Sequence, residues 1–502
     1  MKYSITTIGL LLSNALSGFA SANECAPDPL EYHKSIGITV EKVAQIPTEI
    51  TAPYSYNMMP MDNFVGNTMY FLEQQFGKIY AYDQTTSEVR KVFDMKNSRL
   101  TLGLTEDLTL DWTYGGAAQT TKVKSMTQGK KSNEVYIVFT STTLPEGWTE
   151  PDAFLPPSGA YSQWVCYGQH FVRDIYRVGL IPECSDNGAG LTTLTGYDVF
   201  YKFKVNSKGN LRKPKPFFVS EHAITPGHLG GGIATVADGK ILYSTGDMTV
   251  FGLDGSYPPQ LDFETAGKIL LIDPTKKGKF DIVAKGVKNS QQMRVISNPN
   301  PNLDFLAFMD IGGVTAEEVN AVPLNEILST ETINNFGWGR SLTDGLAREG
   351  TFYVEPGNGL VLGTEPGCMK KVPQPEPGFI GPWIQFGRTA DDYFYAISSF
   401  AVPSKGVDKL KLIWSEFNTG KILGTDENRT GSSPSTGYKI KVYDSNGVFL
   451  ENALNDLLGR EIEPGFTSRG DPRLFHFADG QAGVFVERTG VVYKLTERLV
   501  DR

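Results

Sequence analysis

The sequence has few of the residues and segments that mark several large classes of protein. Only 4 cysteines and 5 histidines occur in 502 residues, and no two cysteines have the Cys-x-x-Cys spacing of a common zinc site. The formal net charge is −9, which argues against a nucleic-acid partner, because such proteins usually carry a basic face. After the first residues, no apolar run is long enough to span a bilayer. We therefore expect neither a zinc domain, nor a nucleic-acid partner, nor a membrane span.

Helical periodicity is scarce as well. The clearest candidates for helices are two short segments, 317–328 and 450–458. Short β-rich runs recur along the whole chain instead, and each is reached through a glycine or a polar turn. These runs are 77–83, 134–139, 239–244, 267–273, 410–414, 437–443 and 490–495. The counts of 53 Gly, 29 Pro, 22 Tyr and 29 Phe also favour a turn-rich, all-β protein.

The strand signals continue along the chain without a linker or a low-complexity segment. This pattern favours one closed all-β domain over several small ones, and a β-propeller fits it best. We expect six blades with long loop insertions, because the chain is longer than six compact repeats of roughly 40 to 50 residues require. The longest loops are expected at 106–129, 144–195 and 355–388.

The first residues have the features of a secretory signal. Lys2 precedes an apolar run from Ile8 to Leu12, and Ala20-Ser21-Ala22 provides a small-residue cleavage site. The apolar run is too short to span a bilayer. We therefore expect residues 1–22 to be a signal peptide and residues 23–502 to be a single β-propeller domain. The mature protein should be soluble and exported, either periplasmic or secreted.

Export would place the cysteines in an oxidising compartment, where two disulfides are the default expectation. Four cysteines allow three pairings. We favour Cys166 with Cys184, which closes a short loop, and Cys25 with Cys368.

One stretch places a histidine and an aspartate at the same end of a predicted hairpin. His228 lies in a glycine-rich loop, and a strand, a turn at Asp238-Gly239 and a second strand ending in Gly246-Asp247 follow. Two antiparallel strands joined by a tight turn return the chain to the end where it began, so His228 and Asp247 can meet. Such a pair can be a general base with a fixed tautomer, and the alternative is a buried histidine satisfied by a neighbouring side chain.

This order of residues resembles the catalytic blade of the soluble quinoprotein glucose and aldose dehydrogenases. In that family a His, a Gly-rich turn, an Asp-Gly hairpin and a strand ending in Gly-Asp follow one another, and the spacing from His228 to Asp247 matches. The family is a six-bladed propeller that uses pyrroloquinoline quinone (PQQ) and calcium. The resemblance implies that His228 is the catalytic base and that Asp247 orients it.

The resemblance also implies which residues contact the quinone. Lys288 and Asn289 stand where the family has an arginine and an asparagine, and lysine keeps the charge but loses the planar guanidinium fork. Arg469 and Arg473 lie in the segment whose arginines face the quinone carboxylates. Gln119 corresponds to a glutamine of the second blade.

Two calcium sites follow from the same resemblance. Gly312 and Gly313 replace a Gly-Pro step whose backbone carbonyls hold the calcium next to the quinone, and a carbonyl ligand survives the change of proline to glycine. Glu318 and Phe336 correspond to the side chain and the carbonyl that hold a second, structural calcium. On residue types alone, Glu317 and Glu318 would be a solvated acidic pair.

The implied function is PQQ-dependent oxidation of an aldose or related sugar at its anomeric hydroxyl, with hydride passing to the calcium-bound quinone. The partners would be a small sugar and an electron acceptor, and the sequence identifies neither the sugar, nor the acceptor, nor the oligomeric state. Two departures from the family leave an alternative open: Lys288 replaces an arginine, and Asn418 replaces a lysine that contacts the cofactor. This alternative is a non-catalytic, calcium-stabilised propeller that binds a glycan or a protein. A calcium-dependent lactonase is less favoured, because such hydrolases hold their metal with several carboxylate and amide side chains.

Overall fold

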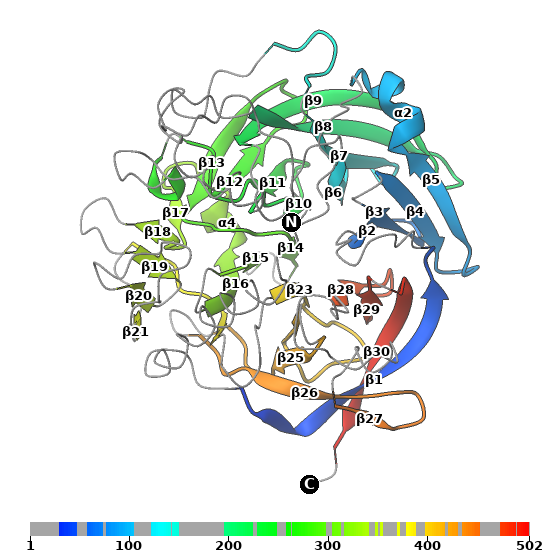
Figure 1. Ribbon diagram of the computed structural model, residues 1–502, viewed down its shortest axis with the longest axis vertical. Helices are drawn as coiled ribbons and strands as arrows, with labels where there is room; N and C mark the ends of the chain where they lie inside the picture. The colour runs from blue at the N-terminus through cyan, green and yellow to red at the C-terminus, as the bar shows by residue number, and fades with distance from the viewer. Residues whose placement is uncertain are drawn as a thin grey trace, which may run out of the picture.

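The computed structural model is drawn in Figure 1, and it describes most of the chain. The described residues are 30–47, 58–73, 77–104, 122–141, 143–149, 195–223, 228–247, 258–262, 264–297, 304–312, 316–340, 347–349, 352–354, 369–371, 378–387, 397–416, 420–429, 434–451, 472–487 and 489–500. The expected signal peptide and all four cysteines lie outside these ranges.

Short sheets arranged around a common centre make up most of the described chain (Figure 1). Four sheets have four strands each, one has five and one has nine. The four-stranded sheets are β2 (Met58–Val65), β3 (Thr68–Glu73), β4 (Lys78–Asp83) and β5 (Val89–Asp94); β6 (Lys122–Gln128), β7 (Glu134–Ser141), β8 (Thr195–Val205) and β9 (Leu211–Ala223); β14 (Met293–Ile296), β15 (Phe305–Asp310), β16 (Ala316–Pro323) and β22 (Ile384–Gly387); and β18 (Gly339–Arg340), β19 (Ala347–Glu349), β20 (Phe352–Val354) and β21 (Met369–Lys371).

The two larger sheets complete the ring. The five-stranded sheet contains β10 (Ile233–Thr235), β11 (Ile241–Ser244), β12 (Lys268–Ile272), β13 (Phe280–Lys285) and β17 (Asn334–Asn335). The nine-stranded sheet contains β23 (Ile397–Ala401), β24 (Leu412–Glu416), β25 (Ile422–Thr425), β26 (Tyr438–Tyr443), β27 (Phe449–Leu450), β1 (Tyr32–Gln45), β30 (Val491–Leu499), β29 (Ala482–Val486) and β28 (Pro472–His476). The described helices are short: α2 (Met95–Leu102), α4 (Leu324–Ile327) and the 3-10 turn η2 (Pro258–Gln260).

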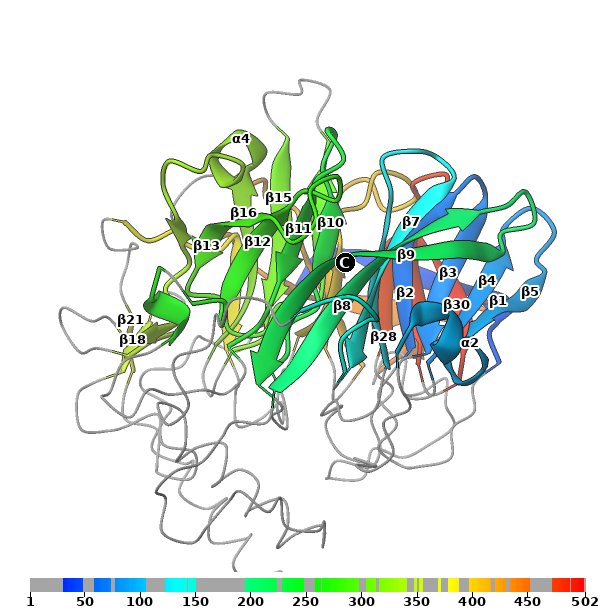
Figure 2. The same ribbon diagram turned by 90° about the horizontal axis from the view of Figure 1, so that it is seen from above.

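The first strands of successive sheets face one another around the centre. β6 contacts β2 on one side and β10 on the other, β10 contacts β14, and β28 contacts both β2 and β23 (Figure 1). The sheet of β18 to β21 lies outside this ring, at the rim (Figure 2). Strands between two packed sheets are buried on both faces, and all eight residues of β7 are buried for this reason.

The two ends of the described chain meet in the nine-stranded sheet. β1 pairs antiparallel with β30 and parallel with β26, so the N-terminal strand lies between strands from the C-terminal part of the chain (Figure 1). The contact joins two groups of strands that would otherwise be separate, β23–β26 and β28–β30.

The prediction of an all-β chain with a propeller-like arrangement of small sheets is confirmed. The described residues form four four-stranded sheets, one of five strands and one of nine, rather than the six separate blades that we predicted; β1 joins two groups of strands into the nine-stranded sheet. Each of the seven runs predicted as strands overlaps a strand. None of the described helices is long and apolar enough to cross a membrane.

Two local predictions are wrong. The helix predicted at 317–328 is instead strand β16 followed by the single turn of α4. β16 lies between β15 and β22, where cross-strand pairing on both sides outweighs the helical spacing of its apolar residues. The segments predicted as loops at 106–129 and 355–388 contain β6 and β21 with β22, respectively. The other segment predicted as a helix, 450–458, overlaps the end of β27 at Leu450, and residues 452–458 lie outside the described residues.

Candidate active site

The structure contains the hairpin that the sequence predicts around His228. β10 and β11 pair antiparallel, with Ile233 opposite Tyr243, and the backbone turns at Asp238-Gly239. The Nδ1 atom of His228 lies 2.9 Å from Oδ1 of Asp247. The predicted meeting of this imidazole and this carboxylate is therefore confirmed.

The backbone around the pair requires glycine. Gly246, directly before Asp247, has a φ of 71°, and a Cβ atom there would overlap the carbonyl oxygen of His228 and the amide of Gly230. His228 itself has a φ of 58°, a conformation that few non-glycine residues adopt. The two loops are therefore packed backbone against backbone, and this close packing fixes the position of both side chains.

Asp247 holds two donors at once. Its Oδ2 atom accepts a hydrogen bond from Nε1 of Trp338 at 2.8 Å, while Oδ1 faces His228. The aspartate side chain is 3% exposed, whereas the His228 side chain is 30% exposed. Because a carboxylate accepts hydrogen bonds, we assign the imidazole proton to Nδ1, which leaves the lone pair on Nε2.

Lys288 lies on the other side of the imidazole. Its Nζ atom is 3.2 Å from Nε2 of His228, and it donates to the carbonyl oxygens of Ile311 at 3.1 Å and Gly312 at 2.9 Å. Nζ also lies 5.4 Å from the centre of the Trp338 ring, which favours a positive charge. Lys288 is buried, and its ammonium group is held against a floor of backbone carbonyls.

Asp310 holds the backbone of the segment that carries Lys288. Its carboxylate accepts hydrogen bonds from the amides of Lys288 at 2.9 Å and Asn289 at 2.7 Å. Burial raises the pKa of Asp310 to about 7, although these two amides and the charge of Lys288 act in the opposite direction. The side-chain oxygen of Asn289 accepts a hydrogen bond from the amide of Gly230 at 3.2 Å. Asn289 thereby ties the histidine loop to the lysine segment.

Glu317 anchors the backbone of the segment that carries the Ile311 and Gly312 carbonyls. It is fully buried and accepts hydrogen bonds from the amides of Gly312 and Ile397, each at 3.2 Å. The neighbouring Glu318 is also buried, lies opposite Asp310 in the β15–β16 pair, and accepts a hydrogen bond from Asn320 at 3.1 Å. The expectation that these glutamates are a solvated pair is therefore wrong.

The carbonyl floor does not fit the calcium ion that the sequence resemblance implies next to the quinone. Calcium takes oxygen ligands at 2.3–2.6 Å. The Gly312 carbonyl that would supply one ligand accepts a hydrogen bond from Lys288 instead. Among the described residues there is also no group of three or more His, Cys, Asp and Glu side chains that could hold a metal.

Comparisons with known proteins find similar chains among solved structures, all at low sequence identity. No protein-family model matches the chain, and no curated protein matches it. The aldose sugar dehydrogenase of Streptomyces coelicolor in its PQQ-bound form is 13% identical, with 92% of this chain and 98% of that chain covered and a TM-score of 0.49. The soluble aldose sugar dehydrogenase of Escherichia coli in its apo form is 12% identical, with 92% and 99% covered and a TM-score of 0.48.

A third similar structure is the calcium structure of a Trichoderma reesei protein of the carbohydrate-active enzyme family AA12. It is 9% identical, with 93% of this chain and 98% of that chain covered and a TM-score of 0.45. At these identities the function has to come from the residues of the site.

The remaining predicted site residues lie outside this cluster or outside the described chain. Arg473 is buried in β28, where its guanidinium donates to the carbonyl of Ser398 at 2.6 Å and lies 3.8 Å from Glu487. Phe336 is buried, and its ring packs against Phe308 at 4.8 Å. Three predicted site residues, together with Asn418, lie outside the described residues: Gln119, Gly313 and Arg469.

Three residues of the site were not predicted from the sequence. Trp338 and Asp310 lie two residues from Phe336 and Gly312, which the resemblance indicates as site residues, but neither was predicted to have a role. Asp310 directly precedes the Ile311-Gly312 floor, so its place at a strand end was the available signal. Glu317 was predicted to be solvated because it forms an acidic pair with Glu318, and nothing in the sequence alone indicates that it is buried.

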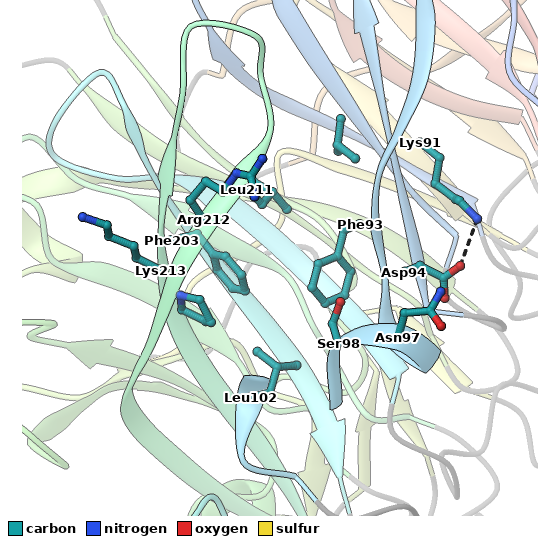
Figure 3. Close-up of a pocket in the computed structure, with 12 residues that line it drawn as sticks. Lys91, Phe93, Asp94, Asn97, Ser98, Leu102, Phe203, Leu211, Arg212 and Lys213 are labelled. Atoms are coloured by element: carbon teal, nitrogen blue, oxygen red, sulfur yellow. Dashed lines mark hydrogen bonds and ion pairs between the residues drawn. The ribbon is translucent and has the colours of Figure 1, made fainter. Parts of the chain in front are cut away.

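A cavity of about 460 Å³ lies elsewhere, between β5, α2 and β9 (Figure 3). Phe93, Leu102 and Phe203 form its apolar side, and the exposed Lys91–Asp94 ion pair lies at its edge. It shares no residue with the His228 cluster, so it is a separate feature of the ring.

Proposed function

We propose that this chain is an exported quinoprotein dehydrogenase that oxidises an aldose or related sugar at its anomeric hydroxyl. One observation carries the proposal: a partly exposed imidazole is oriented by a buried carboxylate and lies beside a buried ammonium group. A base and a cation within 3.2 Å of each other suit a reaction that removes a proton from a hydroxyl group and leaves charge on its oxygen.

In this proposal the sugar hydroxyl takes the place of the Lys288 ammonium at Nε2 of His228, while the ammonium keeps its contacts with the Ile311 and Gly312 carbonyls and stays beside the hydroxyl oxygen. Nε2 of His228 accepts the hydroxyl proton, and Asp247 stabilises the imidazolium that forms. The ammonium of Lys288 stabilises the negative charge that develops on the sugar oxygen. The hydrogen bond from Trp338 keeps Asp247 in place, so the imidazole does not rotate as it is protonated.

The positive charge of Lys288 also suits an anionic quinone. Lys288 and Asn289 would hold PQQ, with Gln119 and Arg469 as further proposed contacts. When bound, PQQ supplies the acceptor for the hydride that leaves the anomeric carbon. Arg473 is a poor candidate for a cofactor contact, because its guanidinium faces Ser398 and Glu487 within the protein. The second, structural calcium at Glu318 and Phe336 stays a prediction.

We further propose that the ring has six blades. β1 supplies an outer strand to β28–β30, so the nine-stranded sheet divides into two blades of four principal strands each, β23–β26 and β28–β30 with β1. The sheet of β18 to β21 is then an insertion at the rim. A signal peptide at 1–22 and disulfides between Cys166 and Cys184 and between Cys25 and Cys368 belong to the same proposal of an exported protein.

Replacement of His228 tests the proposal directly. The wild-type protein, supplied with PQQ, should reduce an artificial electron acceptor in the presence of at least one sugar of an aldose panel. H228Q should lower this rate by about 10² to 10⁴, because it removes the base, while PQQ still binds. H33Q, at a histidine of β1, is the control and should keep the wild-type rate. Absence of both quinone binding and sugar oxidation in the wild-type protein would rule the proposal out.

A second candidate is a non-catalytic propeller that binds a glycan or a protein. One observation favours it: the three atoms that face the Lys288 ammonium are all protein acceptors. Titration with PQQ separates the two candidates, because only the dehydrogenase should show a change in quinone absorbance and a higher melting temperature.

A further inference from the structure

Lys288 makes the contacts that a bound cation would make at this position. An ammonium group has three hydrogen-bond donors. Among the described residues, the carbonyl oxygens of Ile311 and Gly312 and Nε2 of His228 face Nζ as acceptors, at 3.1, 2.9 and 3.2 Å. One positive charge thus bridges the carbonyl floor and the imidazole without any added ion.

The surrounding structure fixes the lysine in this place. Its amide donates to both oxygens of Asp310, and its carbonyl accepts a hydrogen bond from the amide of Asp247 at 2.6 Å. The floor itself is held by Glu317 through the amide of Gly312. Because both the lysine backbone and its acceptors are anchored to buried carboxylates, the ammonium is part of the architecture of the site.

A calcium ion and this ammonium cannot share the floor. Both would use the Gly312 carbonyl, and two cations on one oxygen would lie within a few ångströms of each other in a buried setting where charges are weakly screened. Arginine in place of lysine would extend further and present a planar fork, whereas the compact ammonium of lysine acts as a point charge, as an ion does.

We infer that Lys288 is a built-in cation that takes the place of a bound calcium ion at the Gly312 carbonyl, so that this site forms without the metal. The inference concerns cation binding, and its test needs neither PQQ nor a sugar. Removal of the lysine side chain should convert the floor into a site that binds an added cation.

Trp338 provides a local signal for such binding. Terbium(III) takes the oxygen ligands of calcium, and it emits strongly when a nearby excited tryptophan transfers energy to it. The Trp338 ring lies 5.4 Å from Nζ of Lys288, so an ion that replaced Nζ would lie within reach of this transfer. The wild-type protein should show no terbium emission that depends on Trp338. K288A should show a several-fold rise in emission, and the double variant K288A/W338F should lose it.

Several comparisons make the result decisive. K288Q keeps most of the side-chain volume and adds an oxygen ligand, so it should gain emission even if K288A fails to fold. K285A, at a partly buried lysine paired with Asp262, is the matched control and should behave as wild type. E318Q removes the side chain of the predicted structural calcium site. If calcium raises the melting temperature of the wild-type protein but not of E318Q, that stabilisation comes from the structural site and not from the Gly312 carbonyl.

Two outcomes would overturn the inference. One is Trp338-dependent terbium emission from the wild-type protein, since the ion would then bind although Lys288 is present. The other is the lack of emission from both K288A and K288Q when circular dichroism shows them folded, since the floor would then hold no cation in place of the lysine. Neither outcome bears on whether PQQ and a sugar bind.

Discussion

Two buried lysines near the hairpin differ in the partners of their ammonium groups. Lys288 faces three acceptors of the site. Lys268, in β12, donates to the carbonyl of Ala266 at 2.7 Å, and burial lowers its pKa to about 7 although the charge of Glu264 acts in the opposite direction. Burial disfavours the charged form of a lysine unless partners compensate, and at Lys268 they compensate only in part.

The low pKa of Lys268 predicts how stability depends on pH. Between about pH 7 and 10.5 the unfolded chain holds a proton on this lysine that the folded chain has lost. Stability should therefore rise with pH across this window, with a slope of at most about 1.4 kcal/mol per pH unit from this group. K268M removes the titrating group, so urea denaturation at a series of pH values should show a flatter profile than wild type.

The control for this experiment is K405M, which removes an exposed lysine paired with Asp479, away from Lys268. It should retain the wild-type rise of stability with pH. A K268M profile as steep as that of wild type would mean that another group titrates in the window, and the assignment to Lys268 would be wrong.

At the scale of the element, the hairpin of β10 and β11 depends on close backbone contact. Gly246 and Gly278 have almost the same φ, 71° and 69°, but a Cβ atom would overlap backbone atoms of His228 and Gly230 only at Gly246. At Gly278 no atom lies within 4 Å of the added Cβ. The two positions therefore separate the cost of the backbone conformation from the cost of the contact.

G278A should lower the free energy of unfolding by about 1 kcal/mol, which is the cost of a left-handed conformation for alanine. G246A should lower it by about 3 kcal/mol or more, because the loops must also move apart. Urea denaturation of both variants measures the difference. Equal effects would show that the two loops are not packed as tightly as described here.

The sequence predicts those strands whose local residue pattern is sufficient to identify them. Runs such as 437–443 carry β-branched and aromatic residues between turn signals, so the local pattern alone identifies β26. The segment at 317–328 misleads because β16 is a central strand whose acidic residues are buried by neighbouring strands. Burial that is imposed by partners distant in the sequence leaves no local pattern.

The same reasoning applies to the site. His228 and Asp247 belong to one hairpin, so their contact follows from local geometry. The contacts of Lys288 with Gly312 and His228 join three separate segments, and no spacing in the sequence predicts where a long, flexible side chain ends. The substitution of lysine for arginine was visible, but its consequence for the calcium site required the structure.

At the scale of the whole molecule, the ring is closed by its first strand. β1 lies between β26 and β30, and Ile38 on this strand is opposite Val442 of β26 and Glu497 of β30. Ile38 is fully buried in an apolar cluster with residues from both neighbouring groups of strands. A closed ring has no free edge between its first and last sheets, so damage to this strand should affect both neighbours.

I38A should therefore lower the free energy of unfolding by about 2 to 5 kcal/mol, the usual effect of truncating a buried isoleucine. Hydrogen exchange should show faster exchange in β26 and β30 as well as in β1, while β7, on another sheet, keeps its protection under conditions where only local opening occurs. K42A, at an exposed lysine of the same strand, should leave all of these rates unchanged. If the faster exchange in I38A stayed within β1, this strand would be an accessory to a ring that is already closed without it.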